Sequence, residues 1–136
     1  MEKQNEADQF LPYGLFFSNQ VTLFHLAAQY SSSSVVKVIV EAGADVNGCD
    51  GHKRTPLHYA AQYNDAGVLK TLVDFGAVVN FCDNEKRTPL HYAASYNDVD
   101  VSRTLVDCGA DVSMVSKKGR SVLHFAAEKK QRGGGC

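Results

Sequence analysis

The stretch TPLHYAA, Thr55–Ala61, decides the fold, because it returns unchanged at Thr88–Ala94, 33 residues further along the chain. Weaker copies stand one step outside on each side, TLFHLAA at Thr22–Ala28 and SVLHFAA at Ser121–Ala127. A second motif keeps the same step and reads GADVN at 43–47, GAVVN at 76–80 and GADVS at 109–113. Two motifs in phase over this length predict a repeat protein whose units stack on one another.

Each unit predicts two helices joined by a turn. A proline opens the first helix, where its missing N–H is not needed, and the threonine before it acts as N-cap. These pairs are Thr55-Pro56 and Thr88-Pro89. A second apolar helix is predicted at 35–42, 68–75 and 101–108, each ending at a glycine. One unit cannot bury its apolar face alone, so the expected fold class is an all-α solenoid of stacked helix-turn-helix units with hairpin loops.

In its period and its TPLH signature the chain resembles the ankyrin-repeat family. The resemblance covers about residues 17–130, nearly the whole chain. It implies an N-terminal segment, a repeat domain over 17–132 and a glycine-rich tail. The segment is 1–16, the full repeats are about 17–49, 50–82 and 83–115, the partial fourth is 116–132, and the tail is 133–136.

Both ends of the array depart from the repeat. The apolar run FLPYGLFF at 10–17 carries neither motif, and we interpret it as a cover for the first repeat, with a partner-binding segment as the alternative. After Ala127 the chain continues as EKKQRGGGC, and three glycines oppose a second helix at about 1 kcal/mol each. The fourth unit is therefore a single polar-ended cap or the cut end of a longer array. We favour a fragment or shortened form.

Composition fits one ordinary domain: 136 residues, 44% hydrophobic and 21% charged, with a net charge of −1. This balance excludes a generally basic nucleic-acid binder and a chain too polar to form a core. The polar N-terminus and the lack of a long apolar run lead us to expect a cytoplasmic or nuclear protein. The four cysteines form no CxxC pair, which favours free thiols; they are Cys49, Cys82, Cys108 and Cys136.

Four histidines recur at the repeat step and invite comparison with a metal site; they are His25, His58, His91 and His124. Equivalent atoms of stacked helices lie roughly 8–10 Å apart, whereas zinc requires ligand nitrogens about 2 Å from one ion. The resemblance implies instead that each histidine bonds the threonine of its own motif and the adjacent loop. We therefore predict no metal and no cofactor. Because G-x-S-x-G, Walker A and G-x-G-x-x-G motifs are also missing, we predict a non-enzymatic protein.

A tyrosine column follows the Ala-Ala pairs, two places later in three successive repeats: Tyr30, Tyr63 and Tyr96. The resemblance implies that this slot is exposed on the concave face of the first helices. Tyrosine offers a large rigid contact area with a polar tip, so we predict partner binding there, together with the adjacent Gln62. One turn earlier, Tyr59 and Tyr92 are interpreted mainly as packing between repeats.

Basic residues precede each first helix: His52-Lys53-Arg54, Lys86-Arg87, and Lys117-Lys118 with Arg120. One interpretation is a solvated loop edge. The other is that His52 and the three arginines, Arg54, Arg87 and Arg120, steer an acidic partner onto the tyrosine column. The family prefers glycine where Lys53 and Lys86 stand, which leaves the geometry of those two hairpins open, with turns through Gly51 and Asn84 as the alternative.

The primary hypothesis is a monomeric, non-enzymatic module that binds another protein through its hairpin tips and first-helix face. Two alternatives stay open. The chain is the targeting part of a larger ankyrin-repeat protein such as a ubiquitin-ligase subunit or channel, or it is an adaptor for anionic lipid or, less favoured, nucleic acid. By resemblance alone, Asn47 and Asn80 are candidates for hydroxylation.

Overall fold

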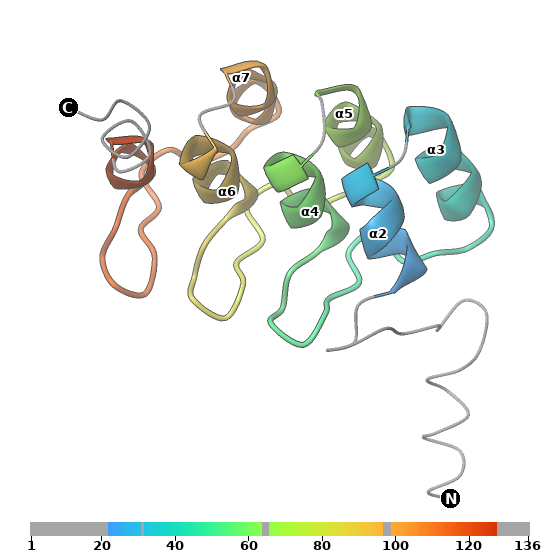
Figure 1. Ribbon diagram of the computed structural model, residues 1–136, viewed down its shortest axis with the longest axis horizontal. Helices are drawn as coiled ribbons and strands as arrows, with labels where there is room; N and C mark the ends of the chain where they lie inside the picture. The colour runs from blue at the N-terminus through green and yellow to red at the C-terminus, as the bar shows by residue number, and fades with distance from the viewer. Residues whose placement is uncertain (1–21, 31, 64–65, 97–98, 128–136) are drawn as a thin grey trace, which may run out of the picture.

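The computed structural model describes residues 22–30, 32–63, 66–96 and 99–127, which form two rows of helices (Figure 1). The first helices of the repeats are α2 (Leu23–Tyr30), α4 (Pro56–Tyr63) and α6 (Pro89–Ser95). The second helices are α3 (Ser33–Glu41), α5 (Ala66–Asp74) and α7 (Val99–Asp107). A further helical segment, 122–127, continues the first row. No β-strand occurs within these residues, and the expected all-α solenoid of helix-turn-helix units is confirmed.

Stacking runs along each row. The helices α2, α4 and α6 pack in that order, as do α3, α5 and α7. Figure 1 shows the hairpin loops extending side by side from the row of first helices, on the side away from the second helices. The hairpins and the first helices together therefore present one surface along the solenoid.

Local sequence explains where the helices begin. The first helices α4 and α6 begin at their prolines, as predicted, and the Thr88 hydroxyl caps α6 by accepting the His91 N–H. The second helices begin two residues before the predicted starts, at Ser33, Ala66 and Val99. These residues precede the apolar run from which the helices were predicted, at 35–42, 68–75 and 101–108.

The hydrophobic core is continuous and is formed by buried side chains of successive repeats. Leucines from neighbouring helices are almost fully buried, among them Leu57, Leu72 and Leu105. Ala60 and Ala93 are also fully buried, and their small side chains let adjacent first helices approach closely. Each unit thus depends on its neighbours for burial, as expected of a solenoid.

The three hairpins share one turn geometry. Lys53 and Lys86 have φ values of 62° and 58°, and Gly119 takes the same place in the last hairpin with φ 76°. The alternative turns through Gly51 and Asn84 are therefore wrong. The two lysines hold a left-handed conformation that costs an ordinary residue roughly 1–2 kcal/mol.

Two of the sequence predictions lie outside the described residues. These are the cover at 10–17 and the ending of the fourth unit beyond 127. Among the residues that are described, no helix is long and apolar enough to cross a membrane.

Candidate partner-binding face

The histidines fasten neighbouring repeats. His58 Nδ1 accepts the Thr55 N–H at 3.1 Å, so its proton resides on Nε2, which donates to the Arg87 carbonyl of the next hairpin at 2.9 Å. His25 makes the same bonds to Thr22 and to the Arg54 carbonyl. This agrees with the structural role predicted for these histidines.

Burial keeps the inner histidines neutral. Desolvation lowers the pKa of His58 to about 4, although the bond to the Arg87 carbonyl opposes the shift. Burial also lowers the pKa of His25 and of His91. His124 makes the same bonds to Ser121 but is exposed, because only a partial unit surrounds it. The histidine column thus carries no charge at neutral pH in its buried positions.

A buried aspartate organises the base of each of the first two hairpins. Asp50 accepts the backbone N–H groups of His52 and Arg54, each at 2.8 Å, and the Tyr59 hydroxyl at 2.6 Å. The Arg54 side chain pairs with the same carboxylate at 2.8 Å, and its guanidinium lies 5.2 Å from the Tyr59 ring centroid. One carboxylate therefore fixes the hairpin, the arginine and the buried tyrosine together.

The same arrangement recurs one repeat later. Asp83 accepts the backbone N–H of Arg87 at 2.8 Å and pairs with its side chain at 3.0 Å. The Tyr92 hydroxyl donates to Asp83, and the Arg87 guanidinium lies 5.3 Å from the Tyr92 ring centroid. Burial alone would raise the pKa of both aspartates, but the tyrosine and backbone hydrogen bonds and the arginine hold it below its usual value.

This pairing changes the charge presented by the hairpins. The Arg54 and Arg87 side chains are partly buried against Asp50 and Asp83, so their charges are largely offset at close range. Steering of an acidic partner by these two arginines stays a prediction. The exposed cationic side chains nearest the tips belong to the lysines: Lys53, Lys86, Lys117 and Lys118.

The last hairpin is built differently. Ser116 stands where the other two hairpins have aspartate, and its hydroxyl accepts the Arg120 N–H at 3.2 Å. Phe125 replaces the buried tyrosine, and the Arg120 guanidinium lies 5.5 Å from its ring centroid. Arg120 thus keeps the arrangement over an aromatic ring, with Ser116 in the place that Asp50 takes in the first hairpin.

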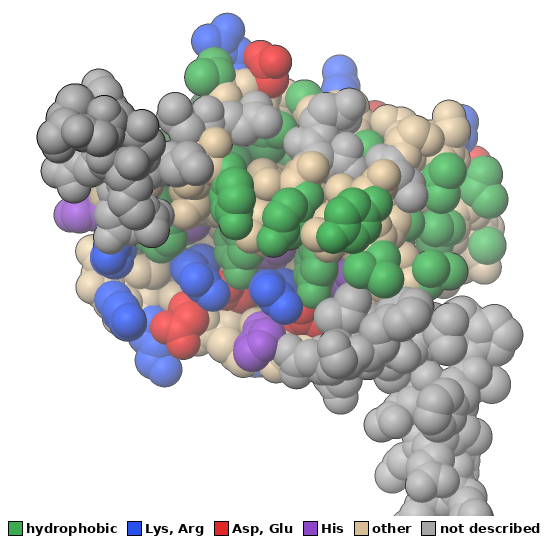
Figure 2. Space-filling model, in the orientation of Figure 1, with side chains coloured by type: hydrophobic (Ala, Val, Ile, Leu, Met, Phe, Trp, Pro, Cys, Tyr) green, Lys and Arg blue, Asp and Glu red, His purple; other side chains and the backbone are tan. Residues whose placement is uncertain are grey.

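The predicted tyrosine column is exposed on the first helices. Tyr30 is 75% exposed, Tyr63 51% and Tyr96 45%. The ring centroids of Tyr63 and Tyr96 lie 5.9 Å apart in a tilted arrangement, and Gln62 Nε2 donates to the Tyr96 hydroxyl at 2.6 Å. We call these four residues the tyrosine face. Figure 2 shows hydrophobic side chains gathered along the first helices, with Lys, Arg, Asp, Glu and His below them on the hairpins.

Tyrosines one turn apart have different roles. Tyr59 and Tyr92 are buried against the aspartates, and burial followed by the hydrogen bond to Asp50 or Asp83 raises the pKa of each strongly. Partial burial, followed by contact with Tyr96, raises the pKa of Tyr63. Tyr63 therefore presents a neutral hydroxyl on a large aromatic ring, which suits both apolar contact and hydrogen bonding.

The structure brings some predicted residues together and separates others. Tyr63, Tyr96 and Gln62 are in contact, whereas His52 lies exposed on a hairpin, where its backbone N–H donates to Asp50 and its carbonyl accepts the Asn84 N–H at 2.9 Å. The site residues predicted from the sequence did not include Asp50 or Asp83. The signal was available as Asp-x-x-x-Arg followed five places later by Tyr, repeated at a step of 33.

Comparison with protein families now has a geometric basis. A family model described as "Ankyrin repeats (3 copies)" matches residues 4–83, 24–116 and 64–133. The chain belongs to the ankyrin-repeat family. Ankyrin repeats are generally protein-protein interaction modules and are typically non-enzymatic. A search of curated proteins found no match.

Two asparagines join the loops that follow the second helices of consecutive ankyrin repeats. Asn47 Nδ2 donates to the Gly76 carbonyl at 3.2 Å, and its Oδ1 accepts the Val78 N–H at 2.9 Å. Asn80 makes the equivalent bonds to Gly109 and Asp111. Their side-chain amides thus act as links between repeats, and their hydroxylation stays a prediction.

The described part of this ankyrin domain contains no group of three or more His, Cys, Asp or Glu side chains placed to hold a metal ion. The thiols of Cys49 and Cys82 each donate to the carbonyl two residues earlier, and burial raises the pKa of both. Reactive thiolates are therefore disfavoured at these two positions.

Proposed function

We propose that this ankyrin domain binds a partner protein across the tyrosine face, with the hairpin tips contacting the edge of the same partner. The observation that carries the proposal is the row of three exposed tyrosines, Tyr30, Tyr63 and Tyr96, between 45% and 75% exposed. Exposed aromatic rings in a row favour a contact surface, because tyrosine supplies large area at low conformational cost.

The preorganised side chains of the tyrosine face favour it as the binding surface over the basic hairpins, which would bind anionic lipid or nucleic acid by charge alone. Gln62 and the two neighbouring tyrosine rings already contact one another, so little side-chain entropy is lost on binding. At the hairpins, the pairing of Arg54 with Asp50 and of Arg87 with Asp83 reduces the net field that anionic lipid or nucleic acid would meet. The partner is accordingly expected to contribute apolar and hydrogen-bonding groups at the face and acidic groups opposite the lysines.

The test is affinity capture with the double variant Tyr63→Ala/Tyr96→Ala, followed by identification of the retained proteins by mass spectrometry. The matched control is Val38→Ala/Val78→Ala, which removes two exposed apolar side chains elsewhere (64% and 49% exposed). Partners retained by wild type and by the control, and lost from the tyrosine variant, would support the face. An unchanged set of partners on a tyrosine variant with wild-type circular dichroism would reject it.

A further inference from the structure

A small hollow of about 170 Å³ lies between the second hairpin and the last one. It is lined by residues of both hairpins and of segment 122–127: Glu85, Arg87, Ser116, Lys118, Arg120 and Phe125. The two hairpins are joined beside it, because the Glu85 carbonyl accepts the Lys117 N–H at 2.7 Å. The hollow is smaller than a typical ligand pocket of about 300–1,000 Å³. Its size therefore suits a single side chain of a partner.

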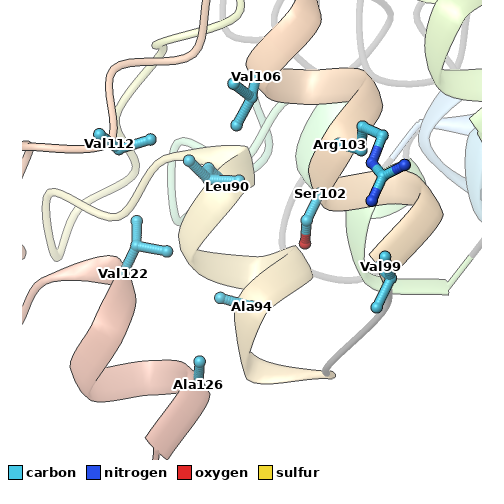
Figure 3. A pocket seen from close by; sticks show the side chains of 9 residues that line it. All are labelled: Leu90, Ala94, Val99, Ser102, Arg103, Val106, Val112, Val122 and Ala126. Atoms are coloured by element: carbon cyan, nitrogen blue, oxygen red, sulfur yellow. The ribbon is translucent and has the colours of Figure 1, made fainter.

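Packing of the last unit fixes the position of the aromatic wall. Val122 is partly buried against the hydrophobic core, and Figure 3 shows its side chain pointing toward the space beside Leu90 on α6. The Phe125 ring lies edge-on to the His91 ring, with 5.0 Å between the ring centroids. Segment 122–127 is thus held against α6 by contacts between described residues, and the hollow lies at the hairpin end of this joint.

The earlier hairpins show which chemical group this arrangement holds. Three residues that line the hollow correspond, one step of 33 residues later, to the buried aspartate, the arginine and the tyrosine of the second hairpin: Ser116, Arg120 and Phe125. In the second hairpin Asp83 Oδ2 accepts both the Arg87 Nε–H, at 3.0 Å, and the Tyr92 hydroxyl. An arginine over an aromatic ring at this place is therefore matched to a carboxylate. Serine is shorter and uncharged, so residue 116 does not itself supply that group.

The charge of the last hairpin differs in the same direction. With histidine counted as neutral, the net charge is +1 at 50–54, 0 at 83–87 and +3 at 116–120. The last segment has three basic residues and no acidic one, and its two lysines are exposed. A concentrated positive charge beside a small hollow attracts an acidic group in preference to a neutral one.

The hollow adjoins the tyrosine face. A second hollow of about 160 Å³ shares Arg87 and Phe125 with the first, and it is also lined by Gln62 and Tyr96 of the tyrosine face. A partner that covers the tyrosine face can therefore reach the hollow between the hairpins with a neighbouring side chain.

We propose that the hollow between the second and last hairpins binds the carboxylate of a glutamate or aspartate in an acidic segment of the partner protein. This carboxylate takes the place in the last hairpin that Asp83 has in the second. Arg120 and Lys118 donate to it, and the Ser116 hydroxyl, which accepts the Arg120 N–H, donates its own proton to it. The proposal rests on the proposed function, because the same partner covers the tyrosine face, and it identifies the acidic contact of that partner.

The probe is fluorescein-labelled hexaglutamate, titrated with the whole chain in about 0.1 M salt and followed by fluorescence anisotropy. Saturable binding is expected, and hexaglutamine is expected not to bind. Ser116→Asp should weaken the binding of hexaglutamate by about tenfold or more, because the new carboxylate occupies the site and repels the peptide. The matched control Ser34→Asp makes the same change of charge at an exposed serine in the first turn of α3, where an acidic side chain is tolerated, and should change binding by less than about twofold.

Further measurements separate the carboxylate site from a loss of structure. Ser116→Asp should keep or raise the urea midpoint, since aspartate stands at this place in the earlier hairpins. Glu85→Gln removes the acidic side chain that lines the hollow and should strengthen the binding of hexaglutamate by about two- to threefold. Lys118→Gln should weaken it by a similar factor, whereas Lys37→Gln, at an exposed lysine on α3, should leave it unchanged.

The proposal is overturned if hexaglutamate shows no saturable binding up to about 1 mM. Equal weakening by Ser116→Asp and Ser34→Asp would also overturn it, since binding would then follow the overall charge. Displacement of hexaglutamate by inorganic phosphate at a concentration about tenfold lower than that of succinate would overturn the choice of a carboxylate.

The tyrosine variant keeps this proposal distinguishable from the proposed function. Tyr63→Ala/Tyr96→Ala should bind hexaglutamate like wild type, because neither ring lines the hollow between the hairpins. Unchanged capture of partners by this variant, with hexaglutamate binding retained, would reject the tyrosine face alone. Tyrosine-dependent capture without hexaglutamate binding would reject the carboxylate site alone.

Discussion

The second hairpin and the last hairpin have the same backbone turn but different support. Thr88 with His91 and Ser121 with His124 make the same local hydrogen bonds, at 2.9 Å between the hydroxyl and Nδ1 in both cases. Yet His91 is fully buried and His124 is exposed. The four-residue motif therefore sets its own geometry, whereas its burial depends on the neighbouring repeat.

The carboxylate is the second difference. Asp83 collects backbone, arginine and tyrosine donors, and Ser116 in its place accepts one backbone N–H. We therefore expect the second hairpin, which has a buried carboxylate and a following repeat, to be more stable than the last one. Three experiments bear on this difference.

Removing the carboxylate should have the largest effect. Asp83→Ala leaves the Arg87 backbone and side chain and the Tyr92 hydroxyl without their acceptor, so we expect a loss of about 3 kcal/mol in the free energy of unfolding. The matched change Ser116→Ala should cost less than about 1 kcal/mol. Urea unfolding followed by circular dichroism measures both. Similar losses for the two variants would show that the hairpins are equally supported.

Acid should destabilise the domain through its buried histidines. The pKa of His58 is about 4 in the folded chain and 6.5 when unfolded, so the unfolded state takes up the proton first. Stability is therefore full above pH 6.5 and falls as the pH approaches 4, by about 2 kcal/mol at pH 5 from His58 alone. The lowered pKa values of His25 and His91 act in the same direction.

Urea midpoints at pH 7.5 and pH 5 measure this loss. His58→Gln should reduce the difference between the two midpoints. A wild-type midpoint that does not move between these pH values would rule out the buried neutral state. Asp50 and Asp83 do not contribute to the change in stability between pH 7.5 and pH 5, because their pKa values lie below the usual 3.8.

The smallest effect concerns the turn that all three hairpins share. Lys53→Gly removes a left-handed lysine at φ 62° and should stabilise the domain by about 0.5–1 kcal/mol, after the greater chain entropy of glycine is deducted. Gly119→Lys should cost a similar amount, since a Cβ there meets no atom within 4 Å and the backbone conformation alone opposes it. Thermal unfolding of the two variants measures the difference. Changes of the same sign in the melting temperatures of the two variants would contradict the prediction.

Much of this architecture could be predicted from the sequence, because each repeat carries the same helix start and stop signals. Thr55 and Pro56 begin a helix, alanines allow close stacking, and Gly76 ends the second helix; each signal returns after 33 residues. The exposure of Tyr63 was implied by the resemblance to the ankyrin-repeat family, which exposes this slot. These features are determined by residues close together in the sequence, so their spacing can be read from the sequence itself.

Features that depend on the folded hairpin were harder to predict. Arg54 and Arg87 stand in a basic stretch, and only the hairpin geometry directs them back to Asp50 and Asp83.

The asparagine links give the solenoid a mechanical direction. Asn47 and Asn80 each hold the loop of the next repeat through both ends of the side-chain amide, whereas the bonds of Ser113, at the third position, run within the described residues to Asp111, two residues away. Under tension along its axis, the array should therefore come apart in sequence from the C-terminal side, with the joint beyond Ser113 yielding at the lowest force.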